Sequence, residues 1–154
     1  MQNWGFSLYL YKPTEQMETP QKTPAELFAA QALASQVKKE LTENILPYWM
    51  GKMINPDGGF YGRIDGLENL DPESPVGNIM TARMLWTFAS AYRLLGNQEY
   101  LDMALRAKDF IISNFYDPEL GGTYWSLSSD GTPLDTKKQI YAIAFTIYGL
   151  AELN

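Results

Sequence analysis

Two stretches of this chain share a glycine pair that leads into aromatic residues, and they hold the side chains best suited to chemistry. The stretches are Asp57-Gly58-Gly59-Phe60-Tyr61-Gly62-Arg63-Ile64-Asp65 and Leu120-Gly121-Gly122-Thr123-Tyr124-Trp125-Ser126-Leu127. The guanidinium of Arg63 could stabilise negative charge that develops on a bound oxygen, because its donors form a rigid fork. From the residues alone, an ion pair with Asp65 or with a helix carboxylate is the alternative role.

Cysteine and histidine are both absent from the 154 residues. Without cysteine the chain can form no disulfide, no thiolate nucleophile and no thiolate-ligated metal site. Without histidine it lacks the commonest general acid or base at neutral pH and the commonest metal ligand. No metal or organic cofactor is implied by the sequence.

The charge and hydropathy patterns argue against nucleic acid and membranes as partners. The net charge is -6, and the acidic residues are scattered among Lys and Arg without a basic stripe. No apolar run approaches the roughly 20 residues that span a bilayer, and the N-terminus lacks a basic segment followed by a continuous apolar core. We therefore expect a soluble, cytoplasmic protein.

Residues 1–36 differ in composition from the rest of the chain, with an aromatic opening followed by three prolines among polar residues. We interpret them as a partly disordered leader that ends in a short helix, and 37–154 as the folded part. Thr23-Pro24 is a typical helix start, with an N-cap residue before a proline at the first helical position. The helix could run on toward Trp49, and Pro47 should end or kink it.

Helical patterns separate and follow the glycine motifs. The pattern over 76–95 is apolar on two sides, as in a helix buried between layers, whereas 98–115 is apolar on one side and places Arg106 largely opposite. A last helix, from near Asp135, is apolar almost all round, and the turn over 128–131 could join two short strands. Outer helix, glycine motif and inner helix thus occur twice, which predicts about two helical hairpins.

The helical spacing also predicts which side chains are buried. Five aromatic residues are expected in the core, namely Trp86, Phe88, Tyr92, Tyr141 and Tyr148. Lys137 and Lys138 are expected to form a solvated or ion-paired helix end. Repeat architectures generally need about three units and a polar cap, and no amphipathic helix follows the last one. We therefore expect the sequence to be the beginning of a larger protein, with an uncovered apolar face that favours self-association.

From about Val37 to Leu153 the sequence resembles the N-acylglucosamine 2-epimerase superfamily, and within it most closely the cellobiose 2-epimerases. Besides the two glycine motifs, the resemblance rests on Glu40-Leu41-Thr42-Glu43-Asn44-Ile45-Leu46-Pro47-Tyr48-Trp49, on Ala82-Arg83-Met84-Leu85-Trp86-Thr87-Phe88 with Ala91-Tyr92-Arg93, and on Asp135-Thr136-Lys137-Lys138-Gln139-Ile140-Tyr141-Ala142-Ile143-Ala144-Phe145. It implies an all-α fold, the N-terminal third of an (α/α)6 barrel, in which short β-like loops join the helices.

The resemblance implies an isomerase that converts the reducing-end glucose of a β-1,4-linked disaccharide to mannose through an enediolate. In the family an arginine of this motif contacts the reducing-end sugar, which would make Arg63 the catalytic residue that stabilises the enediolate. Tyr61, Tyr124 and Trp125 would bind the sugar, because sugars present apolar C–H faces to aromatic rings, and core packing is their alternative role. The family's proton donor and acceptor are histidines from later helices, so we expect this chain alone to be inactive.

Two other functions stay open at this level. An oligosaccharide hydrolase of the same helical-barrel class would use a pair of carboxylates, for which Asp57, Asp65, Asp71 and Asp117 are available. Each of these lies beside a glycine, a proline or a turn, where aspartate has an ordinary capping role. The second alternative is a non-catalytic binding module built from helical hairpins.

Overall fold

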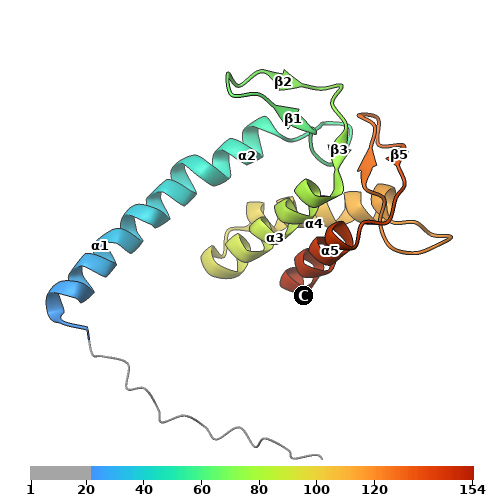
Figure 1. Cartoon of the computed structure of the whole chain (residues 1–154). Helices are drawn as coiled ribbons and strands as arrows, with labels where there is room; N and C mark the ends of the chain where they lie inside the picture. The colour runs from blue at the N-terminus through green and yellow to red at the C-terminus, as the bar shows by residue number, and fades with distance from the viewer. Residues whose placement is uncertain (1–21) are drawn as a thin grey trace, which may run out of the picture. The chain divides into compact units, whose positions relative to one another are not determined.

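The computed structural model describes residues 22–154 (Figure 1). By its internal contacts the chain divides into two units, with the boundary between Lys39 and Glu40. Most of the expected leader lies outside the described residues. Helix α1 (Pro24–Glu40) starts with the predicted cap, since Glu26 N–H donates to Thr23 Oγ1 at 3.3 Å and the Glu26 carboxylate accepts from Thr23 N–H at 2.7 Å. This reciprocal capping box satisfies donors that a helix start otherwise leaves unpaired.

Of the two outcomes expected at Pro47, an end of the helix is not observed, but regular α-helix is interrupted just before it. The π-helical turn η1 (Leu41–Ile45) is followed directly by α2 (Leu46–Lys52), and the N–H of Leu46 donates to the carbonyl of Leu41. Pro47 stands in the first turn of α2, where a missing N–H costs little. The π turn widens the helix just before the proline ring, and the side chain of Leu46 is fully buried.

Three longer helices form the body of the second unit. They are α3 (Asn78–Leu95), α4 (Gln98–Phe110), which continues as the π turn η2 (Ile111–Phe115), and α5 (Ile140–Leu153). Helix α3 packs against both α4 and α5, as its two apolar sides predicted (Figure 1). It ends at Gly96, which adopts the left-handed conformation with φ 71°, and the Asn97 side chain then caps α4.

Helix α5 begins five residues later than predicted. Pro133–Asp135 form strand β5, and Asp135 then accepts a hydrogen bond from the backbone N–H of Lys137 at 3.1 Å. This side-chain turn competes with helix formation, which is an ordinary property of aspartate. Within α5, Gly149 meets α3 so closely that a Cβ there would lie 2.8 Å from the carbonyl oxygen of Ala82.

Short strands gather where α3 and α5 begin (Figure 1). Strand β1 (Arg63–Ile64) pairs antiparallel with β2 (Leu70–Asp71), and β4 (Ser126–Leu127) pairs antiparallel with both β3 (Val76–Gly77) and β5. The predicted turn between β4 and β5 is present, because the N–H of Gly131 donates to the carbonyl of Ser128 at 3.0 Å. The β3–β4 pair joins the second glycine motif to the start of the inner helix α3.

The core predictions hold for α3 better than for α5. Phe88 is fully buried and Trp86 and Tyr92 are half-buried, whereas Tyr141 and Tyr148 are 64% and 53% exposed, so their core assignment was wrong. Ile140 and Ile147 are exposed beside them on α5. The predicted uncovered apolar face is therefore present among the described residues, and it carries the two misassigned tyrosines.

Candidate functional site at the glycine loops

The first glycine loop (53–61) is closed by its own backbone. The N–H of Asn55 donates to the carbonyl of Gly59 at 3.4 Å, and the N–H of Gly58 returns a bond to the carbonyl of Asn55 at 3.1 Å. The N–H of Tyr61 donates to the carbonyl of Met53 at 2.9 Å, across the neck of the loop. These bonds fix the direction in which the chain leaves toward Arg63.

The second glycine loop (115–124) has the same pattern of backbone hydrogen bonds and is one residue longer. The N–H of Asp117 donates to the carbonyl of Gly122 at 3.0 Å, and the N–H of Tyr124 donates to the carbonyl of Phe115 at 2.9 Å. Asp117 therefore corresponds to Asn55, and Tyr124 to Tyr61. The repeat seen in the sequence is thus a repeat of hydrogen-bonded structure.

The glycine pairs serve backbone geometry. All four have positive φ, at 126°, 60°, 71° and 72° for Gly58, Gly59, Gly121 and Gly122. Gly59 also lacks room for a side chain, because a Cβ there would lie 2.5 Å from the Phe110 ring of α4.

The strands that follow the loops show which positions correspond. Arg63 lies opposite Asp71 in the β1–β2 pair, and Ser126 lies opposite Asp135 in the β4–β5 pair. Arg63 and Ser126 are therefore equivalent, and Trp125 corresponds to Gly62. Gly62 leaves no space for a ring, since a Cβ there would overlap the carbonyl oxygen of Pro75. Only the second copy can hold a tryptophan at this position.

Arg63 is exposed, and among residues 22–154 no carboxylate lies within ion-pair distance of its guanidinium. Asp65, the expected alternative partner, accepts hydrogen bonds from Leu67 N–H and Asn69 N–H, both at 2.8 Å, and from the Asn69 side chain at 2.9 Å. The bonds from Asn69 hold the pKa of Asp65 below its usual value. The charge of Arg63 also contributes to this lowering, but it forms no ion pair with Asp65.

Tyr124 and Trp125 each lie beneath a lysine. The Nζ of Lys138 is 4.2 Å from the Tyr124 ring centroid, and the Nζ of Lys137 is 5.1 Å from the Trp125 centroid. Both lysines are also ion-paired, which confirms one of the two roles expected for them. The cation–π contacts were missed in the sequence, because no local signal specifies which ring a flexible lysine covers.

The three aromatic candidates are all half-buried but differ in their surroundings. Tyr61 and Tyr124 pack against the hydrophobic core, which is the alternative role that the sequence left open for them. Trp125 is instead fixed by its backbone, since its N–H donates to the carbonyl of Asp135 at 2.9 Å and its carbonyl accepts from Asn78 N–H at 3.1 Å. This bond ties Trp125 to the first residue of α3.

The carboxylates considered for hydrolysis mainly cap turns. Asp65 and Asp71 accept backbone N–H bonds from residues two positions ahead, and Asp117 accepts from Glu119 and Leu120 at 2.9 and 3.1 Å. The hydrogen bond from Lys138, assisted by these N–H groups, lowers the pKa of Asp117 to about 2. A carboxylate with so low a pKa cannot act as a general acid near neutral pH.

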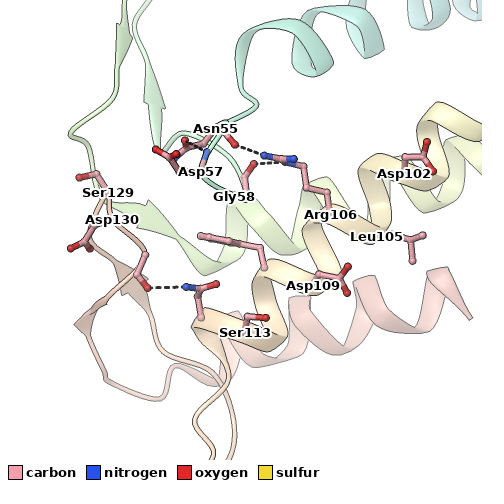
Figure 2. A pocket seen from close by; sticks show the side chains of 14 residues that line it. Asn55, Asp57, Gly58, Asp102, Leu105, Arg106, Asp109, Ser113, Ser129 and Asp130 are labelled. Atoms are coloured by element: carbon pink, nitrogen blue, oxygen red, sulfur yellow. Dashed lines mark hydrogen bonds between the residues drawn. The ribbon is translucent and has the colours of Figure 1, made fainter.

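A cavity of about 600 Å³ lies between the first glycine loop, α4 and the β4–β5 turn (Figure 2). Arg106 lines it and donates to the carbonyls of Gly59, at 2.8 Å, and Asn55. The sequence placed Arg106 largely opposite the apolar side of its helix, in agreement with the buried residues of α4. It did not show that the first glycine loop lies against Arg106, because periodicity describes one helix alone. Arg63 and the three aromatic candidates do not line this cavity.

A second cavity, of about 570 Å³, lies between η1–α2 and α3. Its lining is mostly apolar and includes Trp49, Met80 and Phe88, with Arg83 at its edge. It contains none of the candidate site residues. Among residues 22–154 no three His, Cys, Asp or Glu side chains are placed to hold a metal ion, and no helix is long and apolar enough to cross a membrane.

Comparison with known proteins identifies the class to which these helical hairpins and glycine loops belong. Residues 59–154 match the family model of N-acylglucosamine 2-epimerase (GlcNAc 2-epimerase), and the chain belongs to this family. The family resemblance found in the sequence is confirmed.

Individual relatives point to one branch of the family. The chain is 58% identical over 123 residues to the cellobiose 2-epimerase of Bacteroides fragilis, covering 79% of this chain and 31% of that protein. It is 43% identical over 120 residues to that of Ruminococcus albus, covering 77% and 31%. The cellobiose 2-epimerase structure from Spirochaeta thermophila superposes with a TM-score of 0.78 at 39% identity, covering 86% of this chain and 32% of the other.

The chain thus spans about a third of the length of these relatives and matches their N-terminal part. The structural neighbours are (α/α)6 barrels, so the predicted fold class is confirmed.

Proposed function

We propose that the complete protein is a carbohydrate 2-epimerase that converts the reducing-end glucose of a β-1,4-linked disaccharide, such as cellobiose, to mannose. The observation that carries this proposal is the match to cellobiose 2-epimerases along more than three quarters of the chain, together with family membership. In our proposal 37–154 belong to the barrel domain and 1–36 lie outside it. A cytoplasmic location is part of the same proposal and can be tested by cell fractionation.

In this proposal Arg63 stabilises the negative charge that develops on the substrate. Removal of the proton on C2 of the open-chain sugar gives an enediolate, whose negative charge needs fixed donors. The exposed guanidinium of Arg63, unpaired within the described chain, supports this role. Trp125 is the preferred sugar platform because its backbone is fixed at the start of α3, and Tyr61 and Tyr124 are secondary contacts.

The proton transfers need groups that this sequence does not contain. It has no histidine, and the carboxylates of the glycine motifs are largely engaged in turns. We therefore propose that the chain contributes one wall of the site and that the acid and base come from outside it. No metal or organic cofactor enters the proposal.

Two protein preparations test whether the acid and base come from outside this chain. The first is this chain alone, and the second is a chimera in which the chain replaces the matching N-terminal third of the Bacteroides fragilis enzyme. Exchange at C2 of cellobiose in deuterated water, followed by NMR, should occur with the chimera and not with the chain. Exchange catalysed by the chain alone, or cleavage of the glycosidic bond without C2 exchange by the chimera, would contradict the proposal.

We also propose that the isolated chain associates with itself through α5. Ile140, Tyr141, Ile147 and Tyr148 expose more than half of their surface and form a continuous apolar side of this helix. Light scattering coupled to size exclusion should show a mass above that of the monomer, and Ile147→Asp should shift it toward the monomer. A clean monomer at high concentration would argue against this.

A further inference from the structure

We propose that Arg106 is a positioning residue, which holds the first glycine loop in the conformation that presents Arg63. The catalytic meaning of Arg63 rests on the function proposed above. The contacts that hold the loop are independent of that function.

Arg106 fastens the loop at two points. Its Nε donates to the carbonyl of Gly59 at 2.8 Å and a terminal guanidinium nitrogen donates to the carbonyl of Asn55 (Figure 2). The loop's own bonds bring these two carbonyls side by side, since each also accepts one backbone N–H from the other end of the loop. A planar guanidinium can serve two adjacent acceptors at once, which a single ammonium does less well.

The helix that carries Arg106 supports the loop with further side chains on the same face. Phe110, one turn later, packs its ring against Gly59. Asn114, another turn along, donates to the carbonyl of Gly131 at 3.2 Å in the β4–β5 turn. The spacing of four residues places all three on one stripe of α4–η2. Arg106 therefore acts from a packed helix whose other face is buried.

The segment between Gly59, which Arg106 holds, and Arg63 is conformationally constrained. The next residue, Phe60, is fully buried, and Tyr61 N–H is bonded to the carbonyl of Met53. Gly62 touches the backbone of Pro75, and Arg63 is then paired in β1. A displacement at Gly59 must pass along this constrained segment to the guanidinium of Arg63.

The second glycine loop supplies an internal reference. It is held by the ion pair between Lys138 and Asp117, at 2.7 Å, and Arg106 makes no hydrogen bond to it. A change at Arg106 should loosen the first loop selectively, whereas a general loss of stability should affect both loops.

The experiment is amide hydrogen exchange by NMR on the full chain and three variants. Arg106→Met keeps the aliphatic stem and removes every donor, Arg106→Lys keeps the charge, and Arg93→Met is the control that removes an exposed ion pair with Glu152 instead. Exchange of the Gly58 and Tyr61 amides should accelerate about tenfold or more in Arg106→Met, less in Arg106→Lys, and not in the control. The Gly121 and Tyr124 amides should keep their rates throughout.

Unchanged exchange at Gly58 and Tyr61, or an equal rise in both loops, would overturn the proposal. The functional consequence is read in the chimera, where Arg106→Met should lower kcat about tenfold and Arg106→Lys should recover part of it. An active chimera that is indifferent to Arg106→Met would also overturn the positioning role. An inactive parent chimera would instead count against the proposed function, and the exchange result would stand by itself.

Discussion

The ammonium of Lys138 lies 2.7 Å from a carboxylate oxygen of Asp117 and also covers the Tyr124 ring, at 4.2 Å from its centroid. Asp117 is 5% exposed and lies in the second glycine loop, and Lys138 precedes the inner helix α5. One side chain thus joins a loop, a candidate sugar-binding ring and the approach to an inner helix. The first loop obtains its support differently, from an arginine bonded to uncharged carbonyls.

This difference predicts a pH dependence of the second loop. The pKa of Asp117 is lowered to about 2 in the folded chain from an ordinary value near 3.8, chiefly by the hydrogen bond from Lys138. A depressed carboxylate pKa stabilises the fold above the unfolded pKa, and that stability is lost as the pH falls through the folded pKa. Unfolding by urea should therefore become easier between about pH 4 and pH 2.

The matched variant for this test is Asp117→Asn, which can still accept backbone N–H bonds but cannot titrate. Its free energy of unfolding should be lower at pH 6 and should change less than that of the parent between pH 4 and pH 2. Parallel pH profiles for the two proteins would show that Asp117 is not the responsible group.

Gly62 is predicted to tolerate no side chain. A Cβ there would overlap the carbonyl oxygen of Pro75, which belongs to the backbone and cannot rotate away. Gly62→Ala should lower the free energy of unfolding by about 1–3 kcal/mol, measured by urea denaturation. Gly66→Ala is the control in the adjoining turn, where a Cβ meets nothing within 4 Å, and it should stay within about 0.5 kcal/mol of the parent. Equal effects of the two substitutions would refute the close approach.

Gly149 is predicted to set the separation of α3 and α5. An added Cβ would lie 2.8 Å from the Ala82 carbonyl and 3.1 Å from the Leu85 side chain. Gly149→Ala should therefore destabilise by about 1–3 kcal/mol, despite the better helix propensity of alanine. Gly51→Ala in α2 meets no neighbour and should stabilise by up to about 1 kcal/mol. Thermal unfolding followed by circular dichroism compares them, and a stabilised Gly149→Ala would disprove the tight contact.

Arg63 is predicted to act in the chemical step of the chimera. Arg63→Met removes the forked donors and should lower kcat by about 10²–10³-fold, as loss of an oxyanion donor typically does. Arg63→Lys should recover part of the rate, because charge remains without the fork. Arg93→Met, an arginine of α3 paired with Glu152, is the control and should retain the parent rate. If Arg63→Met kept the kcat of the parent chimera, Arg63 would have no role in the mechanism.

Much of the fold could be predicted because its signals are local. The capping box at Thr23 and Glu26, the helix end at Gly96 and the β4–β5 turn each depend on residues within four positions of one another. The positive φ of the glycine pairs follows from the absence of a side chain. Helical periodicity likewise revealed that α3 is buried on two sides.

The errors arise where distant segments compete with local preference. Asp135 was expected to start a helix, yet it pairs with Ser126 of strand β4, which follows the second glycine loop. Tyr141 and Tyr148 were expected in the core, because their helix is apolar all round and periodicity does not say which sides a neighbour covers.

For the site, the sequence alone determined the repeated glycine motif, the presence of Arg63 and the aromatic residues, and the absence of histidine. Only the tertiary structure decided that Arg63 lacks an ion-pair partner among residues 22–154 and that Trp125 is bonded to the start of α3. The same holds for Arg106, which reaches across 47 and 51 residues to hold the first loop. Side-chain type is read directly from the sequence, and local conformation depends mainly on neighbouring residues. The partner of a long charged side chain depends instead on which backbone groups packing brings within its reach.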